Sequence, residues 1–156
     1  MDKLDSAKIW YEAVDEANSL IDDDIEVDIQ GYDIDGEVVK AARENAREAG
    51  VEHLIHFQER AVKDLRHPKK YGFIITNPPY GERLEEKSAL PALYREFGES
   101  FKKLDSWSAY MITSYEETER YFGRKADKNR KIYNGMLKTY FINSSVQSRR
   151  EGRNIR

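Results

Sequence analysis

Four consecutive residues, Asn77-Pro78-Pro79-Tyr80, are the group in this 156-residue chain best suited to chemistry. The Asn77 side-chain amide and the Pro78 carbonyl each offer an oxygen that accepts a hydrogen bond, and Tyr80 offers a flat aromatic face. Two acceptors beside an aromatic ring suit an NH2 group on a planar heterocycle. Neither proline can donate to a sheet, so strand pairing stops here and the backbone is held extended. The pattern therefore predicts a binding site for an amino group of this kind.

The residues before this group predict the strand that presents it. Residues 71–76 are a short apolar run with β-branched residues at its centre, which is typical of a buried strand. Open α/β sheets bind ligands at the carboxyl ends of strands, so we expect Asn77 to lie at such an end. The alternative is an ordinary strand-ending turn, since Asn-Pro often starts a loop. The following Gly81 and the acidic strand end at Asp33 favour the functional interpretation.

The tetrapeptide resembles the catalytic signature of S-adenosylmethionine-dependent methyltransferases that modify exocyclic amines of bases. The longer stretch 77–84 resembles the guanine-N2 methyltransferases of 23S rRNA whose catalytic domain follows an RNA-binding THUMP domain. The resemblance runs from about Lys8 to about Phe141, and further support comes from residues 31–35, 41–50 and 123–128. It implies an enzyme with S-adenosylmethionine as cofactor and rRNA as the main partner, with DNA as a second candidate.

The resemblance also implies how the cofactor is held. Asp33 matches the acidic residue that binds both ribose hydroxyls, and a carboxylate can accept two hydrogen bonds. Ile34 would lie against the adenine ring, and Asp64 matches the position that accepts from the adenine amino group. Asn77 would border the cofactor as well as the substrate.

On the substrate side, Asn77 and Pro78 would accept both N–H groups of the base amine and hold its nitrogen in line with the methyl group. Pro79 belongs to the same catalytic turn, and Tyr80 would stack on a base taken out of its helix or loop. Arg83 would reach a phosphate or the edge of the base, with a surface ion pair as the alternative.

Charge is distributed unevenly along the chain. Net charge is −3, but residues 1–119 carry −12 and residues 120–156 carry +9. A basic C-terminal part favours a polyanionic partner, with Arg124 and Lys125 as candidate substrate-binding residues. The alternative is that residues 124–131 form only a solvated loop.

Composition excludes several other classes. There is no cysteine, and therefore no disulfide framework; His53 and His56 lack partners for a metal site, so we expect no metal. No apolar stretch has the length of a membrane span, and the start does not resemble a signal peptide, so we expect a soluble cytoplasmic protein. We expect a partial methyltransferase catalytic domain over residues 1–143 and a basic, disordered tail over residues 144–156.

Alternating patterns predict a doubly wound, Rossmann-like α/β sheet of the methyltransferase type that closes on an antiparallel hairpin with an Asn134-Gly135 turn. The predicted helices are 6–21 (capped by Ser6), 36–49 (capped by Asp35 and ended by Gly50), 90–103 and 116–122. The predicted strands are 25–34, 54–58, 71–76 and 107–113, followed by the hairpin, which begins at residue 131, turns at Asn134-Gly135 and continues as a strand through residue 142. In the three longer helices, apolar residues at helical spacing are expected to face inward. They are Ile9, Trp10, Ala13, Val14, Ala17 and Ile21 in helix 6–21, Val38, Val39, Ala42 and Ala46 in helix 36–49, and Leu93, Tyr94, Phe97 and Phe101 in helix 90–103.

One element implied by the resemblance is missing. Family members begin with a strand and a glycine-rich turn that holds the methionine part of the cofactor, whereas the first glycine here is Gly31. We therefore expect an N-terminally truncated domain with weak cofactor binding, in which the strands ending at Asp33 and Asn77 face a gap. Self-association or partial unfolding is expected over closure of that gap. Two other functions stay open: adenine-N6 methylation of DNA or RNA, and a non-catalytic fragment that binds RNA or a partner.

Overall fold

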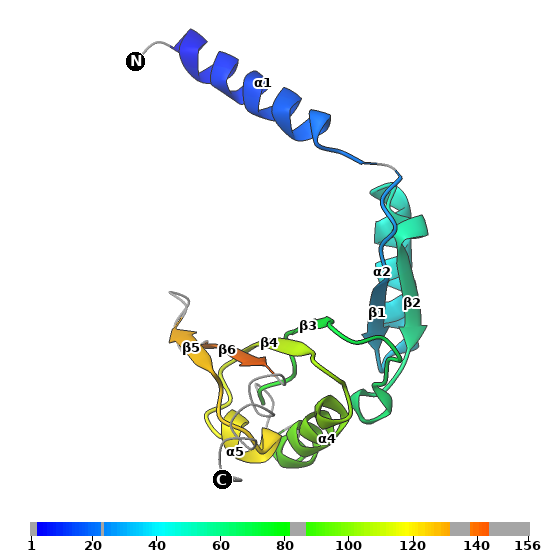
Figure 1. Cartoon of the computed structure of the whole chain (residues 1–156), viewed down its shortest axis with the longest axis vertical. Coiled ribbons are helices and arrows are strands. Elements are labelled where there is room, and N and C mark those ends of the chain that lie inside the picture. The colour runs from blue at the N-terminus through cyan, green and yellow to red at the C-terminus, as the bar shows by residue number, and fades with distance from the viewer. Residues whose placement is uncertain (1–2, 23, 82–86, 132–137, 144–156) are drawn as a thin grey trace, which may run out of the picture.

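The computed structural model describes residues 3–22, 24–81, 87–131 and 138–143. Their elements, drawn in Figure 1, are α1 (Lys3–Ser19), β1 (Ile29–Asp33), α2 (Gly36–Glu48), the 3-10 turn η1 (Glu52–Leu54), β2 (Ile55–Glu59), the 3-10 turn η2 (Val62–Asp64), β3 (Phe73–Thr76), α4 (Leu90–Lys102), β4 (Ser108–Thr113), α5 (Thr118–Phe122), β5 (Lys128–Lys131) and β6 (Lys138–Asn143). The predictions for Arg83, for the Asn134-Gly135 turn and for the 144–156 tail lie outside the described residues.

The strands form two sheets. β1 and β2 pair in parallel, and the second sheet has the order β3-β4-β6-β5, in which β3 and β4 are parallel and β6 is antiparallel to both of its neighbours. The predicted α/β class and the C-terminal antiparallel hairpin are confirmed. Among the described residues no pairing joins β1 to β3, so the doubly wound sheet is interrupted between these two strands (Figure 1).

Local signals in the sequence account for α2. The Asp35 carboxylate accepts a hydrogen bond of 2.9 Å from the Glu37 backbone N–H and so caps the helix. The chain leaves the helix through Gly50, whose φ of 74° is a left-handed conformation that favours glycine. Val39 and Ala46 are buried as predicted, but Val38 is 47% exposed. That prediction is wrong because the main packing partners of α2 among the described residues are β1 and β2, which bury a narrow stripe of the helix.

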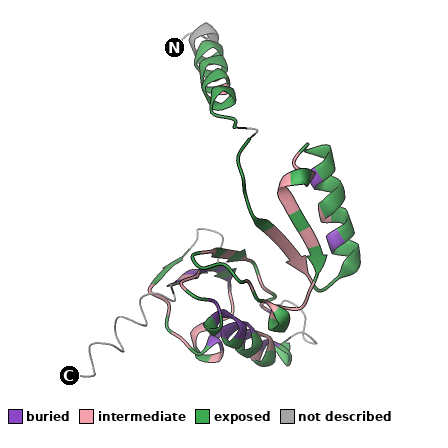
Figure 2. Ribbon diagram, turned by 45° about the vertical axis from the view of Figure 1, so that its right-hand side comes forward, coloured by how far each residue is buried: buried purple, intermediate pink, exposed green. Residues whose placement is uncertain are grey.

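The core lies in the second sheet, under α4 and α5 (Figure 2). Tyr94, Phe97 and Phe101 of α4 are buried, as predicted from their helical spacing. Gly98 permits the close approach of the two helices, because a Cβ at this position would overlap the Phe122 carbonyl. The cluster of buried side chains consists of Phe97, Phe101, Leu104, Ala109, Met111, Phe122, Tyr140 and Ile142.

The opposite face of the second sheet is open. Phe73 and Ile75 are 70% and 83% exposed, whereas Ile74 packs against the core. The prediction of a buried strand is therefore wrong for alternate side chains of β3. The physical reason is that successive side chains of a strand point to opposite faces, and the described residues cover only one of them.

α1 lies apart from both sheets (Figure 1). Its helical spacing was predicted correctly, but Ile9 and Trp10 are 62% and 68% exposed, so the predicted inward face has no cover among the described residues. The helix begins at Lys3, which places Ser6 inside it and not at the cap. None of the helices in the described part of the chain is long and apolar enough to cross a membrane.

Asp28, directly before β1, binds the segment that precedes β3. Its Oδ2 lies 2.6 Å from Lys69 Nζ and 3.4 Å from His67 Nε2, and Gln30 donates to its Oδ1. The hydrogen bonds from Lys69 and then Gln30 lower the pKa of Asp28 to about 2. Lys69 is fixed in turn through its carbonyl, which accepts from Trp107 Nε1 at 2.9 Å. The amino-terminal sides of β1 and β3 are thus connected.

Candidate active site

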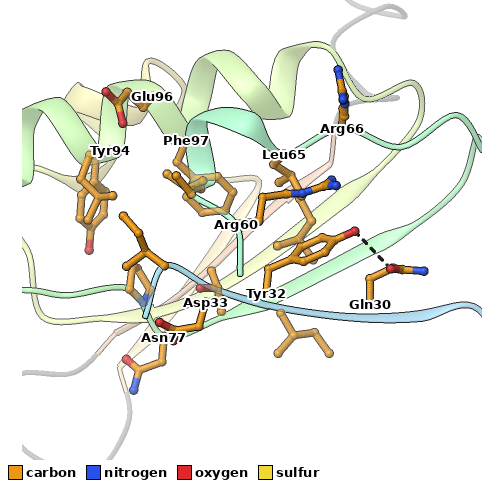
Figure 3. Close-up of a pocket in the computed structure, with 18 of the residues that line it drawn as sticks. Gln30, Tyr32, Asp33, Arg60, Leu65, Arg66, Asn77, Tyr94, Glu96 and Phe97 are labelled. Atoms are coloured by element: carbon orange, nitrogen blue, oxygen red, sulfur yellow. Dashed lines mark hydrogen bonds between the residues drawn. The ribbon is translucent and has the colours of Figure 1, made fainter. Parts of the chain in front are cut away.

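The carboxyl ends of β1 and β3 border one cavity of about 410 Å³. Five of the residues predicted to form the site line it, and they come from two separate segments: Asp33 and Ile34 from the end of β1, and Asn77, Pro78 and Pro79 from the chain after β3. Figure 3 shows Asp33 and Asn77 at the same end of this cavity. The location agrees with the rule that open α/β sheets bind ligands at the carboxyl ends of their strands.

Asn77 is exposed in the cavity, and no other described residue hydrogen-bonds its side-chain amide. Its amide can therefore accept from and donate to a ligand without first breaking a protein contact. Asp33 is partly engaged, because its Oδ1 accepts from the Asp35 backbone N–H at 2.9 Å. The Asp33 backbone carbonyl is held by Arg60 N at 2.8 Å. These two bonds fix the orientation of Asp33 and leave Oδ2 for a ligand.

Tyr94 anchors the turn that carries Asn77. Its hydroxyl donates to the Pro79 carbonyl at 3.1 Å and lies 2.7 Å from Thr113 Oγ1 on β4. Burial raises the pKa of Tyr94, so the hydroxyl stays protonated and remains a donor. Sequence reasoning placed Tyr94 in the core but missed this role, because a bond between α4 and a loop 15 residues earlier leaves no local pattern.

The exit from the turn requires glycine. Gly81 has a φ of 80°, and a Cβ at this position would press against Lys87 and Leu90. A side chain here would therefore strain the backbone and displace the start of α4. The predicted importance of the glycine after Tyr80 thus has a conformational cause.

Tyr32 and Arg60 also line the cavity and were not predicted as site residues. The Arg60 guanidinium lies over the Tyr32 ring, 4.7 Å from its centroid. Arg60 Nη2 also donates to Gln58 Oε1 at 2.9 Å, which fixes the charged group beside the strand. A cation on the β1 side of the cavity would attract an anionic ligand group. No sequence motif marks this pair, because the two residues meet only through the pairing of β1 with β2.

Several predicted site residues lie elsewhere. Asp64 is exposed in η2 and does not line the cavity, although Ala61 and Val62 of the same segment do. Tyr80 is half-buried and also lies outside the lining. Neither side chain belongs to the lining of this cavity, and the roles of Asp64 and Tyr80 stay predictions.

The two basic candidates also lie apart from the cavity. Arg124 pairs with Asp127 at 3.4 Å, with only 17% of each side chain exposed. Lys125 is exposed to solvent, as are all four residues of the neighbouring β5. The ion pair engages the Arg124 guanidinium, and the role of Arg124 as a nucleic-acid contact stays a prediction. The exposed basic residues of this region are Lys125, Lys128, Arg130 and Lys131.

Within the described ranges, no group of three or more histidine, aspartate or glutamate side chains could hold a metal ion.

A family model described as "UPF0020: RMKL-like, methyltransferase domain" matches residues 4–143. The chain is 46% identical over 131 residues to the "Putative RNA methyltransferase YpsC" of Bacillus subtilis (strain 168), covering 84% of this chain and 34% of that protein. It is 40% identical over 137 residues to the "Ribosomal RNA large subunit methyltransferase K/L" of Shewanella baltica (strain OS185), covering 85% of this chain and 19% of that protein. The chain thus spans about a third or less of these relatives.

Solved structures of other proteins are similar to the described fold. One is "SMU.472, a putative methyltransferase complexed with SAH", with a TM-score of 0.78 and 40% identity over 91% of this chain and 37% of the other. The second is a "predicted N6-adenine-specific DNA methylase" from Listeria monocytogenes str. 4b F2365, with a TM-score of 0.77 and 41% identity over 87% of this chain and 35% of the other.

Proposed function

Because the chain belongs to the RMKL-like methyltransferase domain family, we propose that it is the catalytic part of an S-adenosylmethionine-dependent methyltransferase acting on an exocyclic base amine in RNA. The observation that carries this proposal is the Asn77 amide, exposed in the same cavity as Asp33 and free of protein hydrogen bonds among the described residues. We propose that the protein acts in the cytoplasm.

The lining of the cavity fits the adenosine part of the cofactor. Asp33 Oδ2 can accept from the ribose hydroxyls, since only Oδ1 is used by the Asp35 N–H. Ile34, 73% exposed beside it, offers an apolar surface for the adenine ring. Asp64 stays part of the proposal as the acceptor for the adenine amino group. The structure of SMU.472 with SAH supports a cofactor of this kind in the shared fold.

When bound, S-adenosylmethionine supplies a methyl group on a positively charged sulfur. Asn77 and Pro78 would accept the two N–H groups of the base amine, whose lone pair is otherwise delocalised into the ring. Hydrogen bonds in this arrangement orient the nitrogen and stabilise the positive charge that develops on it. The Tyr94–Pro79 bond holds the two acceptors in place. Tyr80 would stack on the base and contribute about 1–3 kcal/mol.

We propose guanine N2 of 23S rRNA as the target. The similarity to the Shewanella baltica rRNA methyltransferase and the resemblance of residues 77–84 support this choice. Phosphates of the RNA would contact Arg83, outside the described residues, and the exposed cations Lys125, Lys128, Arg130 and Lys131. Arg124 would contribute only if its ion pair with Asp127 opened. The similarity to the Listeria monocytogenes protein supports adenine N6 as the second candidate.

The test is methyl transfer from labelled S-adenosylmethionine to 23S rRNA, followed by digestion to nucleosides. N2-methylguanosine is the expected product, whereas N6-methyladenosine would favour the second candidate. Asn77→Ala should lower turnover while leaving binding of S-adenosylhomocysteine nearly unchanged. Asn45→Ala, which changes an exposed residue of α2, is the matched control. Equal loss of turnover and cofactor binding in Asn77→Ala would refute the assignment of Asn77 to the amine.

A further inference from the structure

Two arginines and two tyrosines meet where α4 and α5 lie side by side (Figure 1). Arg95 is exposed on α4, and its guanidinium lies over the Tyr121 ring of α5, 5.1 Å from the ring centroid. The Arg120 guanidinium lies over the same ring at 5.3 Å. The Tyr115 ring is stacked with that of Tyr121, with centroids 6.1 Å apart and an angle of 10° between the planes. We call these four residues the tyrosine–arginine patch.

The patch lies beside the turn that carries Asn77. β3 and β4 are parallel neighbours, so the segments that follow them leave the sheet at the same edge. Asn77 begins one of these segments, and Tyr115 belongs to the other. The centroid of the Tyr115 ring is 4.9 Å from that of Tyr94, whose hydroxyl donates to the Pro79 carbonyl. A row of tyrosine rings thus connects the turn to the patch.

The Arg95 guanidinium keeps its hydrogen-bond donors for a ligand. No carboxylate in the described ranges forms an ion pair with Arg95. Glu99, four residues further along α4, is the partner that helical spacing offers, but its carboxylate pairs with Lys102 at 2.8 Å. A tyrosine ring holds the cation without using the edge of the guanidinium, which binds carboxylate and phosphate oxygens through parallel hydrogen bonds. Arg95 is therefore pre-organised for a phosphate group.

Carboxylates around the patch limit its positive field. Arg120 is paired with Glu117 at 2.8 Å, although 72% of its side chain is exposed. Glu96 and Glu116 are exposed as well. The patch is therefore suited to a short-range contact that positions a nucleic-acid strand, and not to attraction over a distance. Attraction over a distance is the role of the exposed cations at and near β5.

We propose that the tyrosine–arginine patch binds the phosphate backbone of single-stranded RNA next to the nucleotide whose base enters the candidate active site. The inference rests on the proposed function and adds the contact that places the strand relative to Asn77. A base that leaves its helix is flanked by nucleotides of the same strand, and Arg95 would donate two hydrogen bonds to one of their phosphates. Tyr121 would hold Arg95 in that orientation. The Tyr115 hydroxyl would donate to the same strand; burial raises the pKa of Tyr115, so the hydroxyl stays protonated.

Fluorescence anisotropy with a labelled single-stranded RNA of about 15 nucleotides tests the patch without measuring methyl transfer. Arg95→Ala should weaken binding at least about fivefold. It should also reduce the slope of log affinity against log salt concentration by about 0.7, the value for one lost phosphate contact on a single strand. The matched control is Lys40→Ala, which removes the same charge from an exposed position of α2 and should change affinity by less than about twofold.

Further variants separate the contact from the charge. Arg95→Lys keeps the charge but not the planar fork, so it should retain the salt dependence and lose part of the affinity. Tyr121→Leu removes the ring and should weaken binding as Arg95→Ala does, whereas Tyr121→Phe keeps the ring and should bind as the wild type does. Glu116→Gln removes a negative charge next to Tyr115 in the sequence and should strengthen binding. Urea denaturation reports that each variant is folded.

Unchanged affinity and salt dependence in Arg95→Ala would overturn the proposal and would leave the patch as packing between α4 and α5. An equal loss in Lys40→Ala would also overturn it, because net charge alone would then account for the effect. Absence of RNA binding by the wild-type chain would do the same. The proposed function is tested separately by the methylated nucleosides. Equal rates of N2-methylguanosine formation by the wild type and Arg95→Ala, with equal RNA affinity, would refute this inference and leave that function intact.

Discussion

Replacing Tyr94 by phenylalanine removes one hydroxyl from the contact between the Asn77-Pro78-Pro79 turn and the core. The ring stays, so the change creates almost no cavity at a residue that is only 1% exposed. Two hydrogen bonds are lost, one to the Pro79 carbonyl at 3.1 Å and one shared with Thr113 Oγ1 at 2.7 Å. The variant therefore isolates the anchoring role of the hydroxyl.

The expected loss follows from these partners. A hydrogen bond contributes about 0.5–1.5 kcal/mol net, and Thr113 Oγ1 still accepts from Tyr115 N at 3.1 Å. Pro79 is exposed, so water can replace the tyrosine at its carbonyl. We therefore expect Tyr94→Phe to lower the free energy of unfolding by about 1–2 kcal/mol. Tyr94→Ala, which also empties a packed site, should cost about 3–5 kcal/mol.

Urea denaturation followed by tryptophan fluorescence measures both losses, with Tyr11→Phe on the exposed surface of α1 as control. The control should change stability by less than about 0.5 kcal/mol. In the methyl-transfer assay Tyr94→Phe should reduce turnover more than it reduces affinity for S-adenosylhomocysteine, because the turn carries Asn77 and Pro78. A Tyr94→Phe protein as stable and active as the wild type would refute the anchoring role.

Gly98→Ala should lower the free energy of unfolding in urea by about 1–3 kcal/mol, because the new Cβ overlaps the Phe122 carbonyl; this cost outweighs the higher helix propensity of alanine. The control is Gly36→Ala, which should be tolerated because a Cβ there meets only the flexible end of Glu59. Equal losses of stability in the two variants would contradict this packing argument. In an NMR titration the Asp28 carboxyl should have a pKa of about 2, so its ion pair with Lys69 should be present above about pH 4 and weaken as the pH falls through 2. The ion pair should be missing in Asp28→Asn. A titration midpoint of Asp28 near pH 4 would show that the ion pair does not form. Calorimetry of the isolated chain should give a dissociation constant for S-adenosylhomocysteine above about 10 μM. The reason is that no glycine of the described residues lines the cavity, so no glycine-rich turn there holds the amino-acid part of the cofactor. A dissociation constant in the low micromolar range would contradict this prediction.

The sequence by itself determined the local structure and identified the residues that are able to take part in chemistry. The cap by Asp35, the exit at Gly50 and the spacing of Tyr94, Phe97 and Phe101 act over a few residues, so they could be predicted without the fold. The same holds for the location of Asp33 and Asn77 at strand ends, because strand and loop composition change at those points.

Only the tertiary structure decided which faces are covered and which side chains meet. The spacing of hydrophobic residues indicates which face of a helix or strand can be buried, but burial also requires a partner surface. Among the described residues, too little surface packs against four of these side chains to bury them: Ile9, Trp10, Phe73 and Ile75. The Tyr94–Pro79 bond, the Arg60–Tyr32 stack and the Arg124–Asp127 ion pair likewise depend on where separate segments are brought together. Such contacts are determined by packing in three dimensions, which the local pattern of residues does not encode.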